Sequence, residues 1–314
     1  MINEAQGTSE WWSEETVAVV TGGNRGIGLE VCRQLAEKGL TVIMTARRPQ
    51  EELSASAQQF LQEAAQLGRK KVIFHTLDIT QRQSVMNFVD WLKLHVGFID
   101  ILVNNAAVLN ADWKFLEQNN VDMRTFLDYT QVHPPCLNRI LEKQESAKDC
   151  IETNFYGTKR VTKALLPLLR PSSYKPRIVN VSSVYGLLLF LRDDELRKQL
   201  SDTEGLTEQK IDEVLDTFLE DLKSKQAMEK WPLKVPSYTV SKIALNAYTR
   251  LLALELGDKA CVNSATPGYV MTDMTFGTGD LSPAEGAANL VCVALLPAGG
   301  LSGHNFLEGK DAKF

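Results

Sequence analysis

Short apolar runs alternate with longer stretches of helical periodicity along most of this chain. Continuous apolar runs, rather than alternating ones, are typical of strands in a parallel sheet that is covered on both faces. Stretches with apolar residues three and four positions apart predict helices between these runs. The predicted strands are 17–20, 41–44, 72–74, 101–103, 178–181 and 261–263, and the predicted helices are 27–38, 51–67, 84–94, 153–169 and 238–256.

The repeated order of strand and helix predicts the α/β class, with a doubly wound parallel sheet (Rossmann fold) and right-handed crossovers. The sequence shows no solenoid repeat and no low-complexity linker, which favours a single domain over residues 16–314. Residues 1–15 are then an N-terminal extension. Two stretches, at about 110–148 and 187–236, break the alternation and are predicted to be insertions into the domain.

The second insertion contains an amphipathic helix. Its apolar residues fall on one stripe, and Thr207 is the candidate N-cap. Between residues 193 and 230 there are twelve acidic and six basic side chains, so the opposite face of the helix is expected to be solvated. The stripe consists of Ile211, Val214, Leu215, Phe218, Leu219 and Leu222.

Composition narrows the class of function. The chain has 314 residues, of which 44% are hydrophobic and 23% charged, and this balance excludes a disordered scaffold. The formal net charge of −5 argues against nucleic acid or an anionic membrane as partner. Five dispersed cysteines without a CxxC pair predict no metal site and favour a reducing compartment. We therefore expect a cytoplasmic protein with a small-molecule partner and no membrane association.

A glycine-rich turn follows the first predicted strand directly and opens the first predicted helix. Its glycines allow a tight turn and a close approach to a pyrophosphate, which the free N–H groups of a helix N-terminus would bind. The alternative is that the turn is only a tight connection, but its place as the first strand-to-helix turn favours a dinucleotide site. The predicted contacts in this turn are Gly22, Asn24, Arg25, Gly26, Ile27 and Gly28.

The end of the second strand indicates which dinucleotide is bound. An NAD site would place a carboxylate there for the ribose hydroxyls, whereas this chain has the run Thr45–Arg48. Arg47, together with Arg25, would bind a 2′-phosphate through charge-assisted hydrogen bonds. The alternative is that both arginines are ordinary solvated surface charges. We expect the cofactor to be NADPH.

Tyr238 and Lys242 are four residues apart at the start of the last predicted helix and therefore share one helical face. A nearby lysine charge favours the phenolate, so we expect the pKa of the Tyr238 phenol to be lowered. Tyrosine and lysine at this spacing are also common on solvated helices, so the pair is a weak signal alone.

Taken together, these elements resemble the short-chain dehydrogenase/reductase family over roughly residues 15–300. The order along the chain and the strand context both match that family. The matching elements are the glycine turn, Leu77–Asp78, Asn104–Ala107, Asn154, Ser182–Ser183, Tyr238 with Lys242, and Pro267–Gly268.

The resemblance implies a catalytic set of Asn154, Ser183, Tyr238 and Lys242. By this resemblance Ser183 hydrogen-bonds the substrate carbonyl, with the adjacent Ser182 as an alternative, and Tyr238 protonates it. Lys242 binds the ribose hydroxyls and lowers the pKa of the phenol, while Asn154 holds a water molecule in a proton relay. Donors aimed at the oxygen on which negative charge develops lower the barrier to hydride transfer.

The resemblance also implies further cofactor contacts. Asp78 resembles the carboxylate that contacts the adenine amino group, and Thr272 resembles the contact to the nicotinamide carboxamide. Ala107 stands where the family usually has glycine. The complete implied set beyond the glycine turn and Arg47 is Asp78, Ile79, Asn105, Ala106, Ala107, Tyr238, Lys242, Pro267, Gly268, Val270 and Thr272.

The insertion before Tyr238 resembles the carbonyl-reductase-like branch of the family, whose members are often monomers because the insertion covers the dimerisation surface. Trp231–Pro232 and the run Ser241–Arg250 resemble the plant salutaridine reductase and menthone/neomenthol reductase group. These resemblances imply a monomeric, NADPH-dependent reductase of a cyclic terpenoid or alkaloid ketone in plant secondary metabolism. Two alternatives are an enone carbon–carbon double-bond reductase and a non-enzymatic NADPH-binding regulator. The sequence leaves open the ketone, the stereochemistry and the physiological direction.

Overall fold

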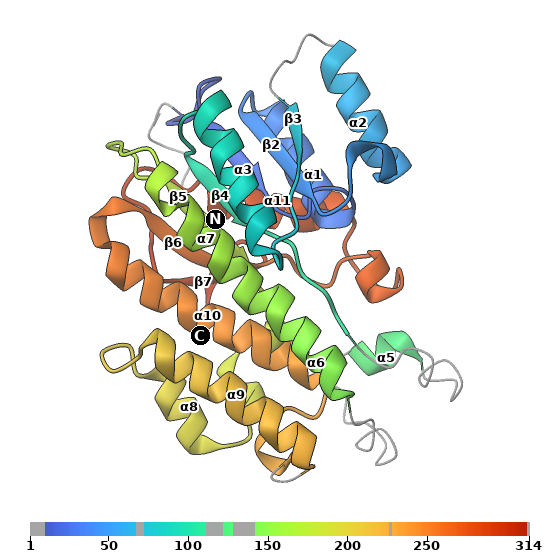
Figure 1. Cartoon of the computed structure of the whole chain (residues 1–314), viewed down its shortest axis with the longest axis vertical. Coiled ribbons are helices and arrows are strands. Elements are labelled where there is room, and N and C mark those ends of the chain that lie inside the picture. Colours follow the sequence, from blue (N-terminus) through green and yellow to red (C-terminus); the bar gives the residue numbers. More distant parts are fainter. Residues whose placement is uncertain (1–9, 67–71, 111–121, 128–141, 226–227, 313–314) are drawn as a thin grey trace.

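The computed structural model describes residues 10–66, 72–110, 122–127, 142–225 and 228–312. One sheet of eight strands, in the order β3-β2-β1-β4-β5-β6-β7-β8, lies at the centre of the fold with helices on both faces (Figure 1). Every neighbouring pair is parallel except β7 and β8. The strands are β1 (Val17–Val20), β2 (Thr41–Ala46), β3 (Val72–Thr76), β4 (Ile101–Asn104), β5 (Arg177–Val181), β6 (Cys261–Thr266), β7 (Asn305–Leu307) and β8 (Lys310–Ala312).

The apolar runs form central strands because both of their faces are buried. In β1, Val17 and Val19 belong to one hydrophobic core, whereas Ala18 and Val20 belong to a second core on the opposite face. All four side chains are at most 5% exposed. This two-sided burial and the strand order confirm the predicted doubly wound sheet.

Helices cover the two faces unequally. The helices α1, α2 and α11 contribute to the core on one face, and α3, α6, α7 and α10 contribute to the core on the other. The helices are α1 (Gly26–Glu37), α2 (Ala55–Gln66), α3 (Arg82–His95), α5 (Met123–Leu127), α6 (Gln144–Ile151), α7 (Thr158–Leu165), α8 (Asp194–Ser201), α9 (Glu208–Ser224), α10 (Pro236–Leu256) and α11 (Pro283–Ala294).

The second insertion forms a further helical layer, α8 and α9, which packs against the outer side of α10 (Figure 1). Thr207 caps α9 as predicted, accepting a hydrogen bond from the Lys210 N–H at 3.2 Å. The apolar stripe of α9 faces inward and is buried, apart from the partly buried Leu219. Lys159 of α7 forms ion pairs with Glu208 and Asp212 of α9, which fastens the insertion to the body.

The structure corrects several predicted boundaries. The helix expected from residue 153 begins earlier, as α6 at Gln144, and passes through a π-helical stretch, η3 (Glu152–Gly157), into α7. The first insertion, predicted over 110–148, therefore ends inside α6, and most of it lies outside the described residues. Pro236, the last residue of the second predicted insertion, already belongs to α10. The sequence pattern did not indicate β7, β8, α5, α8 or α11.

Part of the N-terminal extension packs against the domain. The Trp11 indole N–H donates to the Leu296 carbonyl at 2.9 Å, and its ring lies against Tyr174 and Arg177. In the described part of the chain, no helix is long and apolar enough to cross a membrane.

Candidate active site

The glycine turn between β1 and α1 is fixed by hydrogen bonds that two side chains make with main-chain groups of the turn and of the segment after β4. The Thr21 hydroxyl accepts hydrogen bonds from the N–H groups of Asn105 and Ala106, each at 3.0 Å, and the Asn105 amide donates to the Gly22 carbonyl. Gly22 has φ of +65°, and a Cβ there would lie 2.9 Å from the Ala106 Cα. At Gly28 a Cβ would lie 2.4 Å from the Gly22 carbonyl oxygen. The turn therefore requires glycine at both positions.

The N-terminus of α1 fits an anionic ligand. Its N-cap residue, Arg25, provides no side-chain hydrogen bond to the helix, and the first turn contains no acidic residue. The first N–H groups of a helix have no partner within the helix, and together with the helix dipole they favour a phosphate. The residues present at this turn therefore fit the pyrophosphate of a dinucleotide.

Of the two arginines predicted to bind a 2′-phosphate, Arg25 is the N-cap residue of α1 and Arg47 directly follows β2. Arg25 forms an exposed ion pair with Asp273, with 2.7 Å between Nη1 and Oδ2. Arg47 is exposed and has no ion-pair partner among the residues that the structure describes. Arg48, next to it, pairs with Glu52. Arg47 is thus the arginine available to a ligand at this edge.

The remaining predicted cofactor contacts lie along the same edge of the sheet. Asp78 and Ile79 follow β3, and the Asp78 carboxylate accepts hydrogen bonds from the Thr80 N–H at 2.9 Å and the Thr80 hydroxyl at 2.7 Å. Ile79 is buried. Ala106 and Ala107 follow Asn105 in a half-buried loop after β4.

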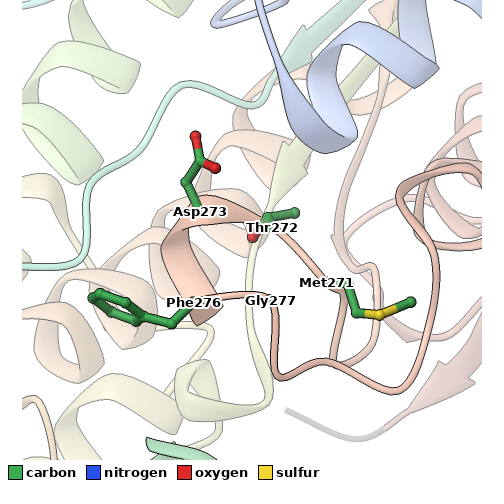
Figure 2. Close-up of a pocket in the computed structure, with 5 residues that line it drawn as sticks. All are labelled: Met271, Thr272, Asp273, Phe276 and Gly277. Atoms are coloured by element: carbon green, nitrogen blue, oxygen red, sulfur yellow. The ribbon is translucent and has the colours of Figure 1, made fainter.

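The segment after β6, residues 267–282, closes over the glycine turn. Thr272 reaches Gly26, where a Cβ would lie 3.4 Å from the threonine methyl group. Pro267 and Gly268 begin this segment, and Val270 is buried within it. A cavity of about 490 Å³ opens here, and Figure 2 shows Met271 and Phe276 projecting to opposite sides of the segment while Asp273 points away from both. The cavity is lined by Met271, Thr272, Asp273, Phe276 and Gly277.

The predicted catalytic residues come together at the carboxyl ends of β4 and β5. Tyr238, on the first turn of α10, is 8% exposed, and the Ser183 hydroxyl from the segment after β5 acts to lower the pKa of its phenol. Lys242 lies one turn further on, with its Nζ 5.6 Å from the centroid of the Tyr238 ring and donating to the Val181 carbonyl at 2.7 Å.

The structure distinguishes the two adjacent serines. Ser183 is half-buried and its hydroxyl acts on the pKa of Tyr238, whereas Ser182 is buried with its hydroxyl beside Gly186. Ser183 is therefore the serine that faces Tyr238.

The predicted direction of the shift in the pKa of the Tyr238 phenol is wrong. Burial raises the pKa of Tyr238 to about 12, although the hydrogen bond from Ser183 acts in the opposite direction. Burial likewise lowers the pKa of Lys242 to about 8. The sequence spacing indicated a stabilising charge beside the phenol but could not show that both groups are desolvated, and desolvation disfavours the charged form of each.

Asn154 lies within the π-helical stretch η3 and is 1% exposed. Its side-chain oxygen, Oδ1, accepts a hydrogen bond from the Val108 N–H at 2.8 Å. Its amide donates to the Val108 carbonyl at 2.9 Å and to the Ser241 hydroxyl at 3.1 Å. The side chain therefore links the segment after β4 to α10, and its predicted role in a proton relay stays a prediction.

Apolar side chains form a cluster with Tyr238. The Tyr185 ring meets the Tyr238 ring edge-on at 6.4 Å between centroids, and the Tyr185 hydroxyl donates to the Leu127 carbonyl of α5 at 3.2 Å. Such a wall fits an apolar substrate. It contains Phe126, Leu127, Cys150, Tyr185 and Val235, with Val108, Leu109, Val184, Phe190, Tyr269 and Met274 packed against them.

Sequence reasoning missed several residues of this site. Thr21 carried a local signal, because it directly precedes the first glycine of the turn. Tyr185 stands two residues after Ser183, but nothing in the pattern marked it. Glu142, which contacts the first turn of α10, comes from a distant part of the chain. Within the described residues, no cluster of histidine, cysteine and acidic side chains could hold a metal ion.

Comparison with known proteins decides the family. Residues 16–191 match the family model described as short chain dehydrogenase, which is more than half of the chain. The chain belongs to the short-chain dehydrogenase family. This membership confirms the resemblance and the enzyme class that the sequence predicted.

Individual relatives of this dehydrogenase cover nearly its whole length. A (−)-isopiperitenone reductase of Mentha piperita is 42% identical over 309 residues, covering 93% of this chain and 96% of that protein. Carbonyl reductase [NADPH] 1 of Mus musculus is 34% identical over 311 residues, covering 96% and 99%. The solved structure of salutaridine reductase from Papaver somniferum superimposes with a TM-score of 0.79 at 36% identity, covering 93% of this chain and 99% of that one.

Proposed function

We propose that this dehydrogenase is an NADPH-dependent reductase that converts a ketone to its alcohol, with Tyr238 as the general acid. The observation that carries the proposal is the buried phenol of Tyr238, which lies at the edge of an apolar wall with Lys242 one helical turn away. When bound, NADPH would supply the hydride that the carbonyl carbon accepts. Ser183 and Tyr238 donate hydrogen bonds to the carbonyl oxygen, and the phenol proton passes to that oxygen as the alcohol forms.

The raised pKa of Tyr238 favours the direction of reduction. With a pKa of about 12, the phenol keeps its proton throughout the physiological range and can serve as an acid. An alkoxide formed from a ketone is a much stronger base than a phenolate, so the proton transfer is downhill. Lys242 is assigned to the cofactor ribose and Asn154 to the relay behind the lysine.

NADPH is supported over NADH by the residues at the end of β2. The run Thr45–Arg48 offers no carboxylate to a ribose hydroxyl, and Arg47 is exposed and has no salt-bridge partner among the described residues. The uncapped N-terminus of α1 accepts the pyrophosphate. One relative carries NADPH in its name, which agrees with this choice.

The substrate is proposed to be a cyclic terpenoid or alkaloid ketone of plant secondary metabolism. The wall beside Tyr238 is built from aromatic and aliphatic side chains, which suits a rigid apolar ring system. Relatives named after isopiperitenone and salutaridine agree with this class. The cytoplasmic location stays a prediction.

We further propose that the enzyme is a monomer. The apolar stripe of α9 covers the outer side of α10 and α6 instead of leaving that surface open. Light scattering should give a mass near that of one chain, 35.0 kDa. Twice that mass would contradict the proposal.

The proposed function is tested by screening monoterpene and alkaloid ketones for NADPH consumption and then comparing two variants on the best substrate. Tyr238→Phe removes the proton donor and should lower kcat by about 10² to 10⁴, with NADPH binding nearly unchanged. Tyr248→Phe is a matched control, because Tyr248 is buried on the same helix but outside the site. Equal kcat for Tyr238→Phe and wild type would reject the tyrosine mechanism.

A further inference from the structure

We propose that Glu142 is a positioning residue for Tyr238: its buried carboxylate holds the first turn of α10 by accepting two hydrogen bonds from Ser237. The inference rests on the proposed function only where it concerns catalysis. Glu142 lies outside α10, and by holding this turn it positions the phenol of Tyr238.

The contacts of Glu142 are specific. One carboxylate oxygen, Oε2, accepts from the Ser237 N–H at 3.0 Å, and the other accepts from the Ser237 hydroxyl. Glu142 is 9% exposed and Ser237 is fully buried. Tyr238 is the next residue after Ser237, so a shift of this turn moves the phenol directly.

The helix α10 lacks a cap of its own. Val235 stands at the N-cap position and provides no side-chain hydrogen bond, and Pro236 has no N–H to donate. The Ser237 N–H is thus the first main-chain donor of the helix, and buried donors of this kind need a partner. A carboxylate near the positive end of a helix dipole is also favourable. Glu142, 95 residues away in the chain, supplies both the acceptor for the Ser237 N–H and the carboxylate at the helix N-terminus.

The backbone before α10 needs support from its surroundings. Val235 has φ of +38°, a left-handed conformation that β-branched residues rarely adopt. Such a conformation persists only when neighbouring contacts fix it. Val235 is 4% exposed and packs in the same apolar cluster as Tyr238. The Glu142 contact and this packing hold the turn from two sides.

Hydrogen bonds near this turn also join members of the predicted catalytic set. The Asn154 amide donates to the Cys150 Sγ at 3.3 Å. The same amide reaches Ser241 on α10. The Ser241 hydroxyl in turn donates to the main-chain carbonyl of Tyr238 at 2.7 Å. Asn154 and Glu142 therefore both contact the first turns of α10, one through Ser241 and the other through Ser237.

The test compares Glu142→Ala and Glu142→Gln with wild type, and uses Glu145→Ala as a matched control because Glu145 is an exposed glutamate on α6. For Glu142→Ala we expect faster amide hydrogen exchange at residues 236–240. We also expect kcat on the best ketone to fall about tenfold to hundredfold through misplacement of the phenol. The Kd for NADPH, measured by fluorescence titration, should stay nearly unchanged.

Glutamine keeps one carbonyl acceptor, so Glu142→Gln should recover most of the lost kcat. If Glu142→Ala is too unstable to purify, Ser237→Ala can be used instead. It removes the hydrogen bond from the Ser237 hydroxyl to Glu142 and should also lower kcat. Unchanged exchange or unchanged kcat in Glu142→Ala would overturn the proposal, as would a parallel loss of NADPH affinity. A wild type that reduces no ketone rejects the proposed function instead, and the exchange comparison still decides whether Glu142 holds the turn.

Discussion

The two sides of the site are built by different means. On the cofactor side, the glycine turn and the N-terminus of α1 present main-chain groups to the ligand, and the side chains of Thr21 and Asn105 fix the turn. On the substrate side, the surface beside Tyr238 is made by side chains from segments far apart in the sequence, including Tyr185 and Val235. A main-chain site requires particular residue types at fixed local spacing, whereas a side-chain wall accepts many combinations of apolar residues.

This difference predicts how the two sides respond to substitution. Changes on the cofactor side should alter cofactor affinity locally. Changes on the substrate side should act through packing and hydrogen bonds transmitted over a distance, because α10 carries Tyr238 and is itself held by α9 and Glu142.

The largest effect is expected from the support of α10. Phe218 is fully buried between α9 and the body and meets Trp231 edge-on at 5.2 Å between ring centroids. Phe218→Ala should lower the free energy of unfolding by about 3 to 5 kcal/mol through lost burial and a cavity. The matched control is Thr217→Ala, because the neighbouring Thr217 is exposed and its loss should change the free energy of unfolding little. The free energy of unfolding is measured by urea denaturation. If Phe218→Ala lowers it only slightly, the insertion is not part of the cooperative fold.

A smaller effect is expected from the pH dependence of stability at Glu142. Burial raises the pKa of this carboxyl from 4.5 to about 7, so the folded state binds the proton more tightly than the unfolded state does. Its contribution to stability is therefore full below pH 4.5 and is lost as the pH rises through about 7. The pKa difference corresponds to about 3 kcal/mol.

The matched variant for that titration is Glu142→Gln, which cannot ionise. Between pH 4.5 and about 7, the range spanned by the two pKa values, wild type should lose more unfolding free energy than the variant. Parallel stability curves for the two proteins would contradict the raised pKa.

The smallest effect is expected at the cofactor arginines. Arg47→Ala should weaken NADPH binding by about 1.5 to 3 kcal/mol, roughly tenfold to a hundredfold, and leave NADH binding unchanged. Arg25→Ala should lose less, because Asp273 already pairs with that guanidinium. Arg48→Ala is the control, since Arg48 pairs with Glu52. Equal use of NADPH and NADH by wild type would refute the assignment of these arginines.

The same contrast explains what the sequence could predict. The central strands and the glycine turn were found because β-branched runs and glycine spacing are local consequences of two-sided burial and a tight turn. The strands β7 and β8 were missed, since three-residue strands such as Lys310–Ala312 carry no apolar run. The start of α6 was also missed, because Gln144–Lys148 is polar and the π-helical stretch beyond it has no periodic signature.

Residue spacing alone predicted only part of the site, and the resemblance to the family implied further residues such as Asn154 and Ser183. Tyr238 and Lys242 share a face of α10, and their spacing gave that relation. The predicted direction of the shift in the pKa of the Tyr238 phenol was wrong. Burial sets that direction, and it depends on packing from α5 and the segment after β5. Glu142 could not be found, because its partner Ser237 is 95 residues away and no local pattern connects them.

The most direct test of the central claim is product analysis with an α,β-unsaturated cyclic ketone and NADPH, by gas chromatography. If Tyr238 protonates the carbonyl oxygen, wild type should produce the allylic alcohol and Tyr238→Phe should produce almost none. A saturated ketone from wild type, with Tyr238→Phe still active, would contradict the account and identify an enone reductase instead.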